Sequence, residues 1–274
     1  MSRPDEMPEA SDSGSLPADL EPALARLAGT PELLVALDFD GTLAPEVDVP
    51  DDARALPEAH DAVLALLELP HTAVAFISGR AMQSLQHVAQ LPESALLVGS
   101  HGVEVHTDGR TEVDLDDAEL ARRDALGATL EGIAEGLEGV WIEVKPAGFA
   151  LHTRVAGDAE TATAERRALA ETELEANGLT VRRGKNVIEF SVRSTTKGEA
   201  VERLRRQTGA TAVLFAGDDV TDEDGFAALG PGDLGLKSGD GETRASHRVT
   251  GPREVASTLR MLAEKRAGAP LPRL

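Results

Sequence analysis

Residues 33–42 read LLVALDFDGT, in which five aliphatic residues are followed by two aspartates, a glycine and a threonine. An aliphatic run of this length is typical of a strand buried on both faces of a parallel sheet. Open α/β sheets place their ligand sites at the carboxyl ends of such strands, where Asp38 and Asp40 lie. Two carboxylates so close together are costly to keep ionised unless a divalent cation and a phosphate ester bind there.

The composition is that of a folded, acidic protein. The chain has 274 residues, of which 41% are hydrophobic, enough for one large or two modest domains. Its formal net charge of −21 argues against nucleic acid or an anionic membrane as a partner. It has no cysteine, no apolar stretch approaching the roughly 20 residues of a membrane span, and no apolar region typical of a signal peptide. We therefore expect a soluble, cytoplasmic protein, and we predict a monomer.

Strand-like and helical segments alternate in the first and last parts of the chain. Residues 1–17 are rich in Pro, Ser, Asp and Glu, and we expect them to form a disordered acidic lead. After it, strands are expected at 33–37, 73–77, 96–98 and 212–216, and helices at 20–27, 53–68, 197–207, 222–229 and 253–266, with another after Gly79. This rhythm predicts a parallel sheet with helical crossovers.

The middle of the chain has a different pattern, which reads α-β-β-α-β-β. Helices are expected at 116–137 and 158–176, and extended segments at 140–145, 149–155, 179–183 and 186–192. We therefore predict an α/β protein with a Rossmann-like core of parallel strands and a smaller inserted α/β cap. The predicted core comprises residues 30–108 and 194–274, and the predicted cap comprises residues 109–193.

The residues that follow the first strand can carry phosphoryl-transfer chemistry. Asp38 can attack a phosphoryl group and form an aspartyl-phosphate, which divides one difficult hydrolysis into two easier displacements. Asp40 can protonate the leaving sugar oxygen and then deprotonate the attacking water. Gly41 permits a tight turn, and Thr42 offers its hydroxyl and backbone N–H to the phosphate. The alternative is an Asp-Gly turn with capping aspartates, which is common in proteins.

A second acidic cluster follows the strand expected at 212–216. Residues 217–224 read GDDVTDED and contain five carboxylates. Acidic residues favour the first turn of a helix, which explains part of this cluster. Mg²⁺ prefers oxygen ligands, and Asp219 and Asp222 are placed to orient such ligands or their waters. The expected ligands are the carboxylates of Asp38 and Asp218 and the backbone carbonyl of Asp40.

Two smaller signals lie between the acidic clusters. Residues 76–80 read FISGR, so that Ser78 ends the second strand with a hydroxyl; the alternative is a helix N-cap. Lys197 begins an expected helix, where a cation fits the helix dipole poorly. That local cost is explained if Lys197 neutralises the phosphate and the nucleophilic carboxylate, whereas a surface lysine is the alternative. A loose phosphoryl-transfer transition state needs such dispersed positive charge.

Taken in order, DFDGT, FISGR, Lys197 and GDDVTD resemble the four motifs of the haloacid dehalogenase superfamily, whose first motif aspartate attacks phosphorus. From about residue 30 onward the chain resembles the trehalose-6-phosphate phosphatase family. The resemblance is carried by the sequence segments LDFDGTLAP, FISGR, GSHGVE, TTKGEAV and GDDVTDED. The resemblance implies a Mg²⁺-dependent phosphomonoesterase that releases trehalose from trehalose 6-phosphate. It implies four catalytic residues, Asp38, Asp40, Ser78 and Lys197. Thr42 and Arg80 would bind the substrate.

The middle section resembles the sugar-binding cap of the same family. That cap carries ExK, HxR and GK…E elements, which are matched by residues 143–145 (EVK), 152–154 (HTR) and 184–189 (GKNVIE). Charged side chains suit a sugar because they form charge-assisted hydrogen bonds with its hydroxyls. The polar face of any antiparallel sheet would alternate in the same way, and this is the alternative. His101 and Glu104 are possible neighbours of the site. The resemblance implies that five side chains hold the disaccharide: Glu143, Lys145, Arg154, Lys185 and Glu189.

Two departures from the family pattern leave other substrates open. The family often has Arg where this chain has Val220, and often has Pro within the stretch at residues 191–194. Phosphatases for sucrose 6-phosphate and for mannosyl- or glucosyl-3-phosphoglycerate share the same core. A non-catalytic sugar-phosphate sensor, a partner domain of a synthase and a mutase are further alternatives. The presence of both motif-one aspartates and Lys197 favours an enzyme.

Overall fold

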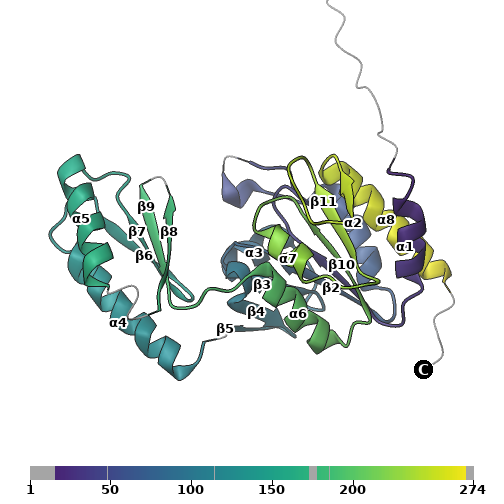
Figure 1. The fold of residues 1–274 in the computed structure, drawn as a ribbon, viewed down its shortest axis with the longest axis horizontal. Helices are drawn as coiled ribbons and strands as arrows, with labels where there is room; N and C mark the ends of the chain where they lie inside the picture. The colour runs from purple at the N-terminus through teal and green to yellow at the C-terminus, as the bar shows by residue number, and fades with distance from the viewer. Residues whose placement is uncertain (1–15, 48, 114, 173–177, 185, 270–274) are drawn as a thin grey trace, which may run out of the picture.

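The computed structural model describes residues 16–269 except 48, 114, 173–177 and 185. The acidic lead expected at 1–17 falls almost entirely outside these residues. The described chain forms an eight-stranded sheet and a separate four-stranded sheet, each with its own helices (Figure 1). We call the part built on the larger sheet the core and the part built on the smaller sheet the cap. None of the helices in the described ranges has the length and apolar character of a membrane span.

The core sheet has the strand order β12-β11-β10-β1-β2-β3-β4-β5. All five residues of β1 are buried, and β1 pairs in parallel with β2 on one side and β10 on the other. This confirms the parallel sheet predicted from the aliphatic run. The parallel strands are β1 (Leu33–Leu37), β2 (Thr72–Ile77), β3 (Leu96–Gly99), β10 (Ala212–Gly217), β11 (Leu234–Ser238) and β12 (His247–Val249).

An antiparallel hairpin, which the sequence analysis did not predict, extends this sheet beyond β3. Strand β4 (Glu104–Thr107) pairs with β3, and β5 (Arg110–Val113) pairs with β4. Asp108 and Gly109 form the connection with φ values of 50° and 75°, as a two-residue hairpin turn requires. The predicted cap boundary at residue 109 is therefore wrong, because the chain stays in the core sheet through Val113.

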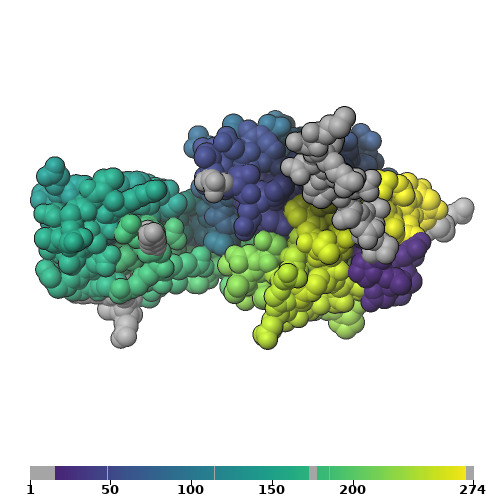
Figure 2. Space-filling view, turned by 90° about the horizontal axis from the view of Figure 1, so that it is seen from above, coloured from purple at the N-terminus to yellow at the C-terminus, as the bar shows by residue number. Residues whose placement is uncertain are grey.

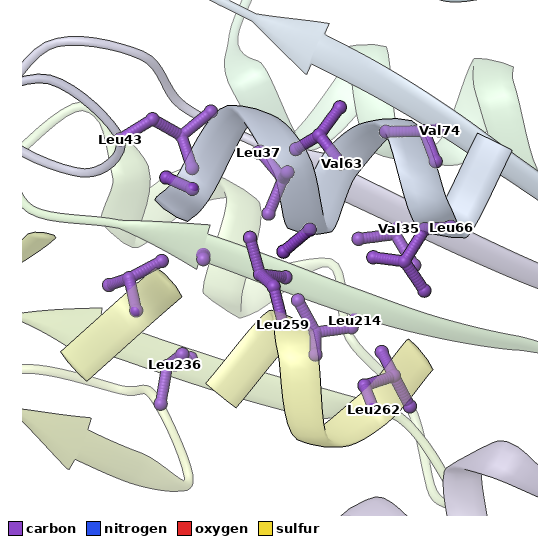
Figure 3. Close-up of a cluster of buried hydrophobic side chains, with 14 of the residues drawn as sticks. Val35, Leu37, Leu43, Val63, Leu66, Val74, Leu214, Leu236, Leu259 and Leu262 are labelled. Carbon is purple, nitrogen blue, oxygen red and sulfur yellow. The ribbon is translucent and has the colours of Figure 1, made fainter. Parts of the chain in front are cut away.

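Helices cover both faces of the core sheet. Alternate residues of β1 point to opposite faces and are buried on both. Val35 and Leu37 pack with α1, α2, α3 and α8, and Figure 3 shows this cluster between the sheet, α2 and α8. Leu34 and Ala36 pack with α6 and α7. These core helices are α1 (Leu20–Ala28), α2 (Pro57–Leu67), α3 (Met82–Ala89), α6 (Lys197–Thr208), α7 (Asp222–Ala227) and α8 (Pro252–Gly268), and short 3₁₀ turns lie at Pro50–Asp52 and Ser100–Gly102.

The cap sheet is antiparallel throughout, with the order β6-β7-β9-β8. One face packs against α4 and α5 around a hydrophobic cluster of its own, as the predicted α-β-β-α-β-β pattern requires. The strand expected at 149–155 ends at His152, and the last part of the helix expected at 158–176 lies outside the described residues. The cap elements are α4 (Asp117–Ala134), β6 (Trp141–Lys145), β7 (Gly148–His152), α5 (Asp158–Glu171), β8 (Thr180–Gly184) and β9 (Val187–Ser191).

Candidate active site

The carboxyl ends of three neighbouring parallel strands bring the predicted catalytic residues together. Asp38 follows β1, Ser78 follows β2, and Asp218 follows β10. The backbone N–H of Asp38 donates to the carbonyl of Ala216 at 2.9 Å, so the sheet pairing continues through the predicted nucleophile. Lys197 reaches the same place from the first residue of α6, whose start is fixed by a capping box between Thr196 and Glu199.

Lys197 binds two buried carboxylates at once. Its Nζ donates to Asp38 Oδ1 at 2.6 Å and to Asp222 Oδ1 at 2.7 Å. Burial lowers the pKa of Lys197, but the charges of Asp38 and Asp222 outweigh burial and raise the pKa overall. Burial is also the main reason that the pKa of Asp38 rises to about 8, with Lys197 opposing the rise and the nearby carboxylates adding to it. The cluster is therefore short of positive charge, and a divalent cation would correct that deficit.

The acidic cluster fits a hard cation such as Mg²⁺. Carboxylate oxygens of Asp38, Asp218 and Asp222 lie within 4.8 Å of one another. Asp222 is already satisfied, because its Oδ2 accepts from the backbone N–H groups of Asp218 at 3.0 Å and Asp219 at 2.9 Å while its Oδ1 accepts from Lys197. Asp222 therefore orients the loop, and Asp38 and Asp218 are left to face a cation. The predicted roles of Asp38 and Asp218 as metal ligands and of Asp222 as an orienting residue stay predictions.

Each of the two acidic motifs contains a glycine against which a carboxylate packs closely. A Cβ at Gly41 would lie 2.0 Å from Asp218 Oδ2, and the φ of Gly41 is +73°. A Cβ at Gly217 would lie 2.2 Å from Asp222 Cγ. A carboxylate packs directly against the glycine backbone in both places, that of Asp218 from the opposing loop and that of Asp222 from the end of the same loop, so a side chain there would displace it.

Thr42 contacts carboxylates instead of an open phosphate position. Its side chain is fully buried, and its hydroxyl lies 3.3 Å from Asp38 Oδ2 and 3.2 Å from Asp218 Oδ1. The hydroxyl thus lies between the predicted nucleophile and an expected metal ligand. The predicted contact of Thr42 with phosphate stays a prediction.

Arg80 holds the expected acid–base residue. Its Nε and Nη2 each donate to one carboxylate oxygen of Asp40 at 2.6 Å, and its Nη1 donates to Ser84 Oγ at 3.1 Å. Such a bidentate pair fixes both the position and the plane of the carboxylate. Ser78 is buried and its hydroxyl accepts from the backbone N–H of Arg80 at 3.2 Å. Because α3 begins only at Met82, Ser78 is not the helix N-cap that the sequence left open.

Two residues of β11 join the acidic loops, and the sequence analysis missed both. The buried Nζ of Lys237 donates to the backbone carbonyl of Asp218. Ser238 Oγ donates to the carbonyl of Gly41 at 2.9 Å. Lys237 therefore holds the loop after β10 and Ser238 holds the loop after β1. The sequence feature that could have identified them is the Lys-Ser pair that follows the apolar residues of β11, a strand that the sequence did not predict.

The second face of the cap sheet carries polar and aromatic side chains. Glu143 accepts from Lys145 Nζ at 2.6 Å and pairs with His152 Nε2 at 2.9 Å. Burial raises the pKa of Glu143, but hydrogen bonds from Lys145 and His152 outweigh burial and lower it overall. The indole of Trp141 stacks on His152 with a centroid distance of 3.8 Å, and 47% of Trp141 is exposed. Glu189 lies on the same face, since it pairs with Ala150 and Ala150 pairs with Glu143.

A cavity of about 180 Å³ lies where core and cap meet, and the two lobes are visible in Figure 2. It brings together Lys145 and Glu189, two of the five predicted sugar-binding residues. Arg154 lies in a turn beyond β7 and outside this lining, and Lys185 lies outside the described residues. Arg182 is a lining residue that the sequence analysis did not identify. The remaining lining includes Gly79, Ala81, Ser100, His101 and Val103 from the core, and Gly148, Thr180 and Ser191 from the cap.

Comparison with known proteins identifies the relatives of this chain. The trehalose-6-phosphate phosphatase of Escherichia coli is 37% identical over 252 residues, which cover 86% of this chain and 90% of that protein. The bifunctional trehalose-6-phosphate synthase/phosphatase of Thermoproteus tenax is 34% identical over 232 residues, 84% of this chain but only 32% of that protein. The solved structure of Aspergillus fumigatus trehalose-6-phosphate phosphatase has a TM-score of 0.67 and 26% identity, covering 92% of this chain and 99% of that one.

These relatives agree with the family resemblance of the motifs and with the predicted fold of a Rossmann-like haloacid dehalogenase core with an inserted cap. The sequence profile of the trehalose-phosphatase family matches residues 36–265, which span both acidic motifs and the whole cap. The chain therefore belongs to the trehalose-phosphatase family.

Proposed function

We propose that this protein is a Mg²⁺-dependent phosphomonoesterase that hydrolyses trehalose 6-phosphate to trehalose and inorganic phosphate. The observation that carries the proposal is the buried contact of Lys197 with Asp38 and Asp222, at 2.6 and 2.7 Å. A carboxylate nucleophile needs a nearby cation to remain ionised and to offset the charge of the phosphate. The family of the chain supports the choice of substrate.

In the first chemical step, a carboxylate oxygen of Asp38 attacks phosphorus and the sugar oxygen leaves. Asp40 protonates that oxygen, so the sugar departs as a neutral alcohol. In the second step Asp40 accepts a proton from water, which attacks the phosphorus of the aspartyl-phosphate and restores Asp38. Arg80 orients Asp40 for both transfers through its two 2.6 Å contacts.

The positive charge that this chemistry needs comes from side chains and from a bound cation. Lys197 remains charged between its two carboxylates and can also face a phosphate oxygen. Asp38, Asp218 and the backbone carbonyl of Asp40 would hold Mg²⁺, which when bound neutralises charge on the phosphoryl oxygens. Ser78 follows β2 at the same edge of the sheet, and in this proposal its hydroxyl contacts the phosphate.

The cap supplies contacts for the sugar. Glu143 and Lys145 share one sheet face with Glu189, and Lys145 and Glu189 line the cavity beside the core. Paired charges of this kind bind hydroxyls with directed hydrogen bonds. We place the disaccharide between this face and the loop after β2, where closure of the cap would exclude bulk water.

The first test is phosphate release in the presence of Mg²⁺ from a panel of esters. The panel contains trehalose, sucrose and glucose 6-phosphates, mannosyl- and glucosyl-3-phosphoglycerate, and p-nitrophenyl phosphate. We expect trehalose 6-phosphate to have the highest kcat/KM. Preference for another ester would overturn the substrate and retain the chemistry, and release from none would favour a sensor or partner domain.

Removal of the metal is a second test. Excess chelator should abolish activity and added Mg²⁺ should restore it; full activity in chelator would reject the cation site.

We also propose that the protein acts as a cytoplasmic monomer and that neither nucleic acid nor membranes are its partners. The net charge of −21 supports the exclusion of nucleic acid and anionic membranes, because like charge repels phosphate-rich surfaces. Sedimentation velocity should give a single species with the mass of one chain, 28.8 kDa. A concentration-dependent dimer would contradict the assignment.

A further inference from the structure

The loop after β3 has an unusual backbone. Ser100, His101 and Gly102 have φ values of 50°, 57° and 119°, so three successive residues have positive φ and two of them carry side chains. Non-glycine residues rarely adopt this conformation, which persists only where surrounding contacts impose it and which often occurs at functional sites.

Specific hydrogen bonds impose this conformation. The backbone N–H of Ser100 donates to the carbonyl of Arg80 at 2.7 Å, and that of His101 donates to the carbonyl of Ser78 at 3.0 Å. The buried carboxylate of Glu104 accepts from Ser100 Oγ at 2.7 Å and from the backbone N–H of Met82 at 2.8 Å. The loop is thereby fixed to the segment that carries the predicted phosphate-binding Ser78.

The strained loop places the imidazole of His101 on the wall of the cavity between core and cap. The ring lies against Gly79, where a Cβ would come within 2.6 Å of Cε1 and 2.7 Å of Nε2. Lys145, Arg182 and Glu189 of the cap line the same cavity. His101 is thus a core residue that reaches the side of the site where the cap residues lie.

The ring of His101 is neutral and has unused hydrogen-bonding capacity. Burial, with the charges of Arg182 and Lys197, lowers its pKa to about 4, and Asp219 opposes this. Within the described ranges, neither ring nitrogen has a hydrogen-bond partner. A neutral imidazole offers one donor and one acceptor. A sugar hydroxyl also has both, whereas a phosphate oxygen only accepts and is better matched by the nearby cations.

We propose that His101 binds a hydroxyl of the sugar ring that carries the phosphate, and that the left-handed loop after β3 serves to hold it there. This inference rests on the proposed sugar-phosphatase function. Ser78 and His101 then act as neighbours, the first toward the phosphate and the second toward the sugar.

The decisive variant is His101→Gly, because glycine removes the imidazole and also relieves the positive φ. We expect its thermal unfolding midpoint to equal or exceed that of the wild type. Its kcat/KM for trehalose 6-phosphate should fall about tenfold, mainly through KM, which corresponds to one lost hydrogen bond. Its kcat/KM for p-nitrophenyl phosphate, which has no sugar, should change by less than about twofold.

Asp108→Gly is the matched control, since Asp108 has a φ of 50° in the β4–β5 turn and does not line the cavity. It should be stabilised in the same way while both activities stay at the wild-type level. His101→Asn tolerates the same φ and retains a donor and an acceptor, so it should recover part of the loss.

The wild-type measurement and the variant measurement decide different claims. If the wild type prefers another sugar ester, the substrate of the proposed function is wrong, and His101→Gly is judged on that ester in the same way. A wild type that turns over only the aryl phosphate overturns both proposals. An unchanged kcat/KM for the preferred sugar ester, or an equal loss on the sugar ester and the aryl phosphate, overturns the role of His101 alone.

Discussion

At the scale of single residues, Lys197 joins the two acidic loops. Its ammonium contacts Asp38 after β1 and Asp222 at the start of α7. The sequence could indicate this role because a lysine at the first position of a helix has a visible local cost. The orientation of Thr42 could not be predicted in the same way, because its hydroxyl faces Asp218, which lies 176 positions further along the chain.

Replacement of the nucleophile should abolish catalysis without unfolding the protein. We expect Asp38→Asn to lower kcat by at least about 10⁴-fold, because an amide cannot form the phosphorylated intermediate. The thermal unfolding midpoint should not fall, since one of several mutually repelling carboxylates is removed. Phosphate release and a thermal melt measure the two effects. Asp219→Asn is the control, because Asp219 accepts from the N–H of Val220 in the same acidic loop and should lose far less.

The stability of the protein should depend on His101 between pH 6.5 and about 4. The pKa of His101 is lowered from 6.5 to about 4, so the unfolded chain binds a proton in this range and the folded chain does not. Its contribution is therefore present above pH 6.5 and is lost as the pH falls toward 4. Urea unfolding of the wild type and His101→Gly at pH 7 and pH 5 measures this. The wild type should lose more stability, and equal losses would show that the ring titrates normally.

At the scale of secondary-structure elements, β11 shows why some strands escaped sequence analysis. All five of its residues are buried, yet they include Gly235 and Lys237, which favour a loop in a sequence reading. Gly235 suits this position because Phe226 and Ala245 lie 3.1 Å from where a Cβ would be, so glycine fits without moving either neighbour. Lys237 can be buried because the carbonyl of Asp218 accepts its hydrogen bond. Both reasons lie in other parts of the chain.

Helix α8 is attached to the sheet by a buried arginine at the edge opposite the active site. The guanidinium of Arg266 donates to the carbonyls of Ala28 and Thr30 at 3.0 and 2.9 Å, and to Thr72 Oγ1 at 2.6 Å. These groups lie at or before the amino ends of β1 and β2, whereas the catalytic residues follow the carboxyl ends. We therefore expect Arg266 to contribute to stability and not to the chemistry.

We expect Arg266→Met to lower the free energy of unfolding by about 3 kcal/mol, because buried carbonyls lose their donor. The kcat at 25 °C should stay within about twofold of the wild type. Denaturant unfolding and phosphate release measure the two quantities. Arg260→Met, at an exposed position of the same helix, should change neither. A large drop in kcat for folded Arg266→Met would contradict the separation of the two edges.

At the scale of the whole molecule, the insertion of the cap between β5 and α6 places a second sheet beside the catalytic edge (Figure 1). The cap sheet has its helices on one face, and its second face, which carries Glu143, Lys145 and Glu189, contributes to the cavity shared with the core. We therefore expect the phosphate chemistry to depend on the core, and most sugar contacts other than the one proposed for His101 to come from the cap, so that the two can be altered separately.

Glu189→Ala tests that separation. We expect its kcat/KM for trehalose 6-phosphate to fall about 10- to 100-fold, because a charged hydrogen-bond acceptor for the sugar is lost. Activity toward p-nitrophenyl phosphate should change by less than about threefold. Glu171→Ala is the matched control, since Glu171 pairs with Arg167 on the helical side of the cap. Equal losses on both esters would exclude Glu189 from sugar recognition.

The sequence by itself determined the parallel core, the α-β-β-α-β-β pattern of the insertion and the family resemblance of the catalytic aspartates. These features are local: an aliphatic run marks β1, and carboxylates at strand ends mark the site. Only the tertiary structure decided that β5 belongs to the core sheet, that Lys237 holds the Asp218 loop and that His101 faces the cap. Each of these depends on contacts between segments far apart in the chain, and no local pattern encodes where such segments meet.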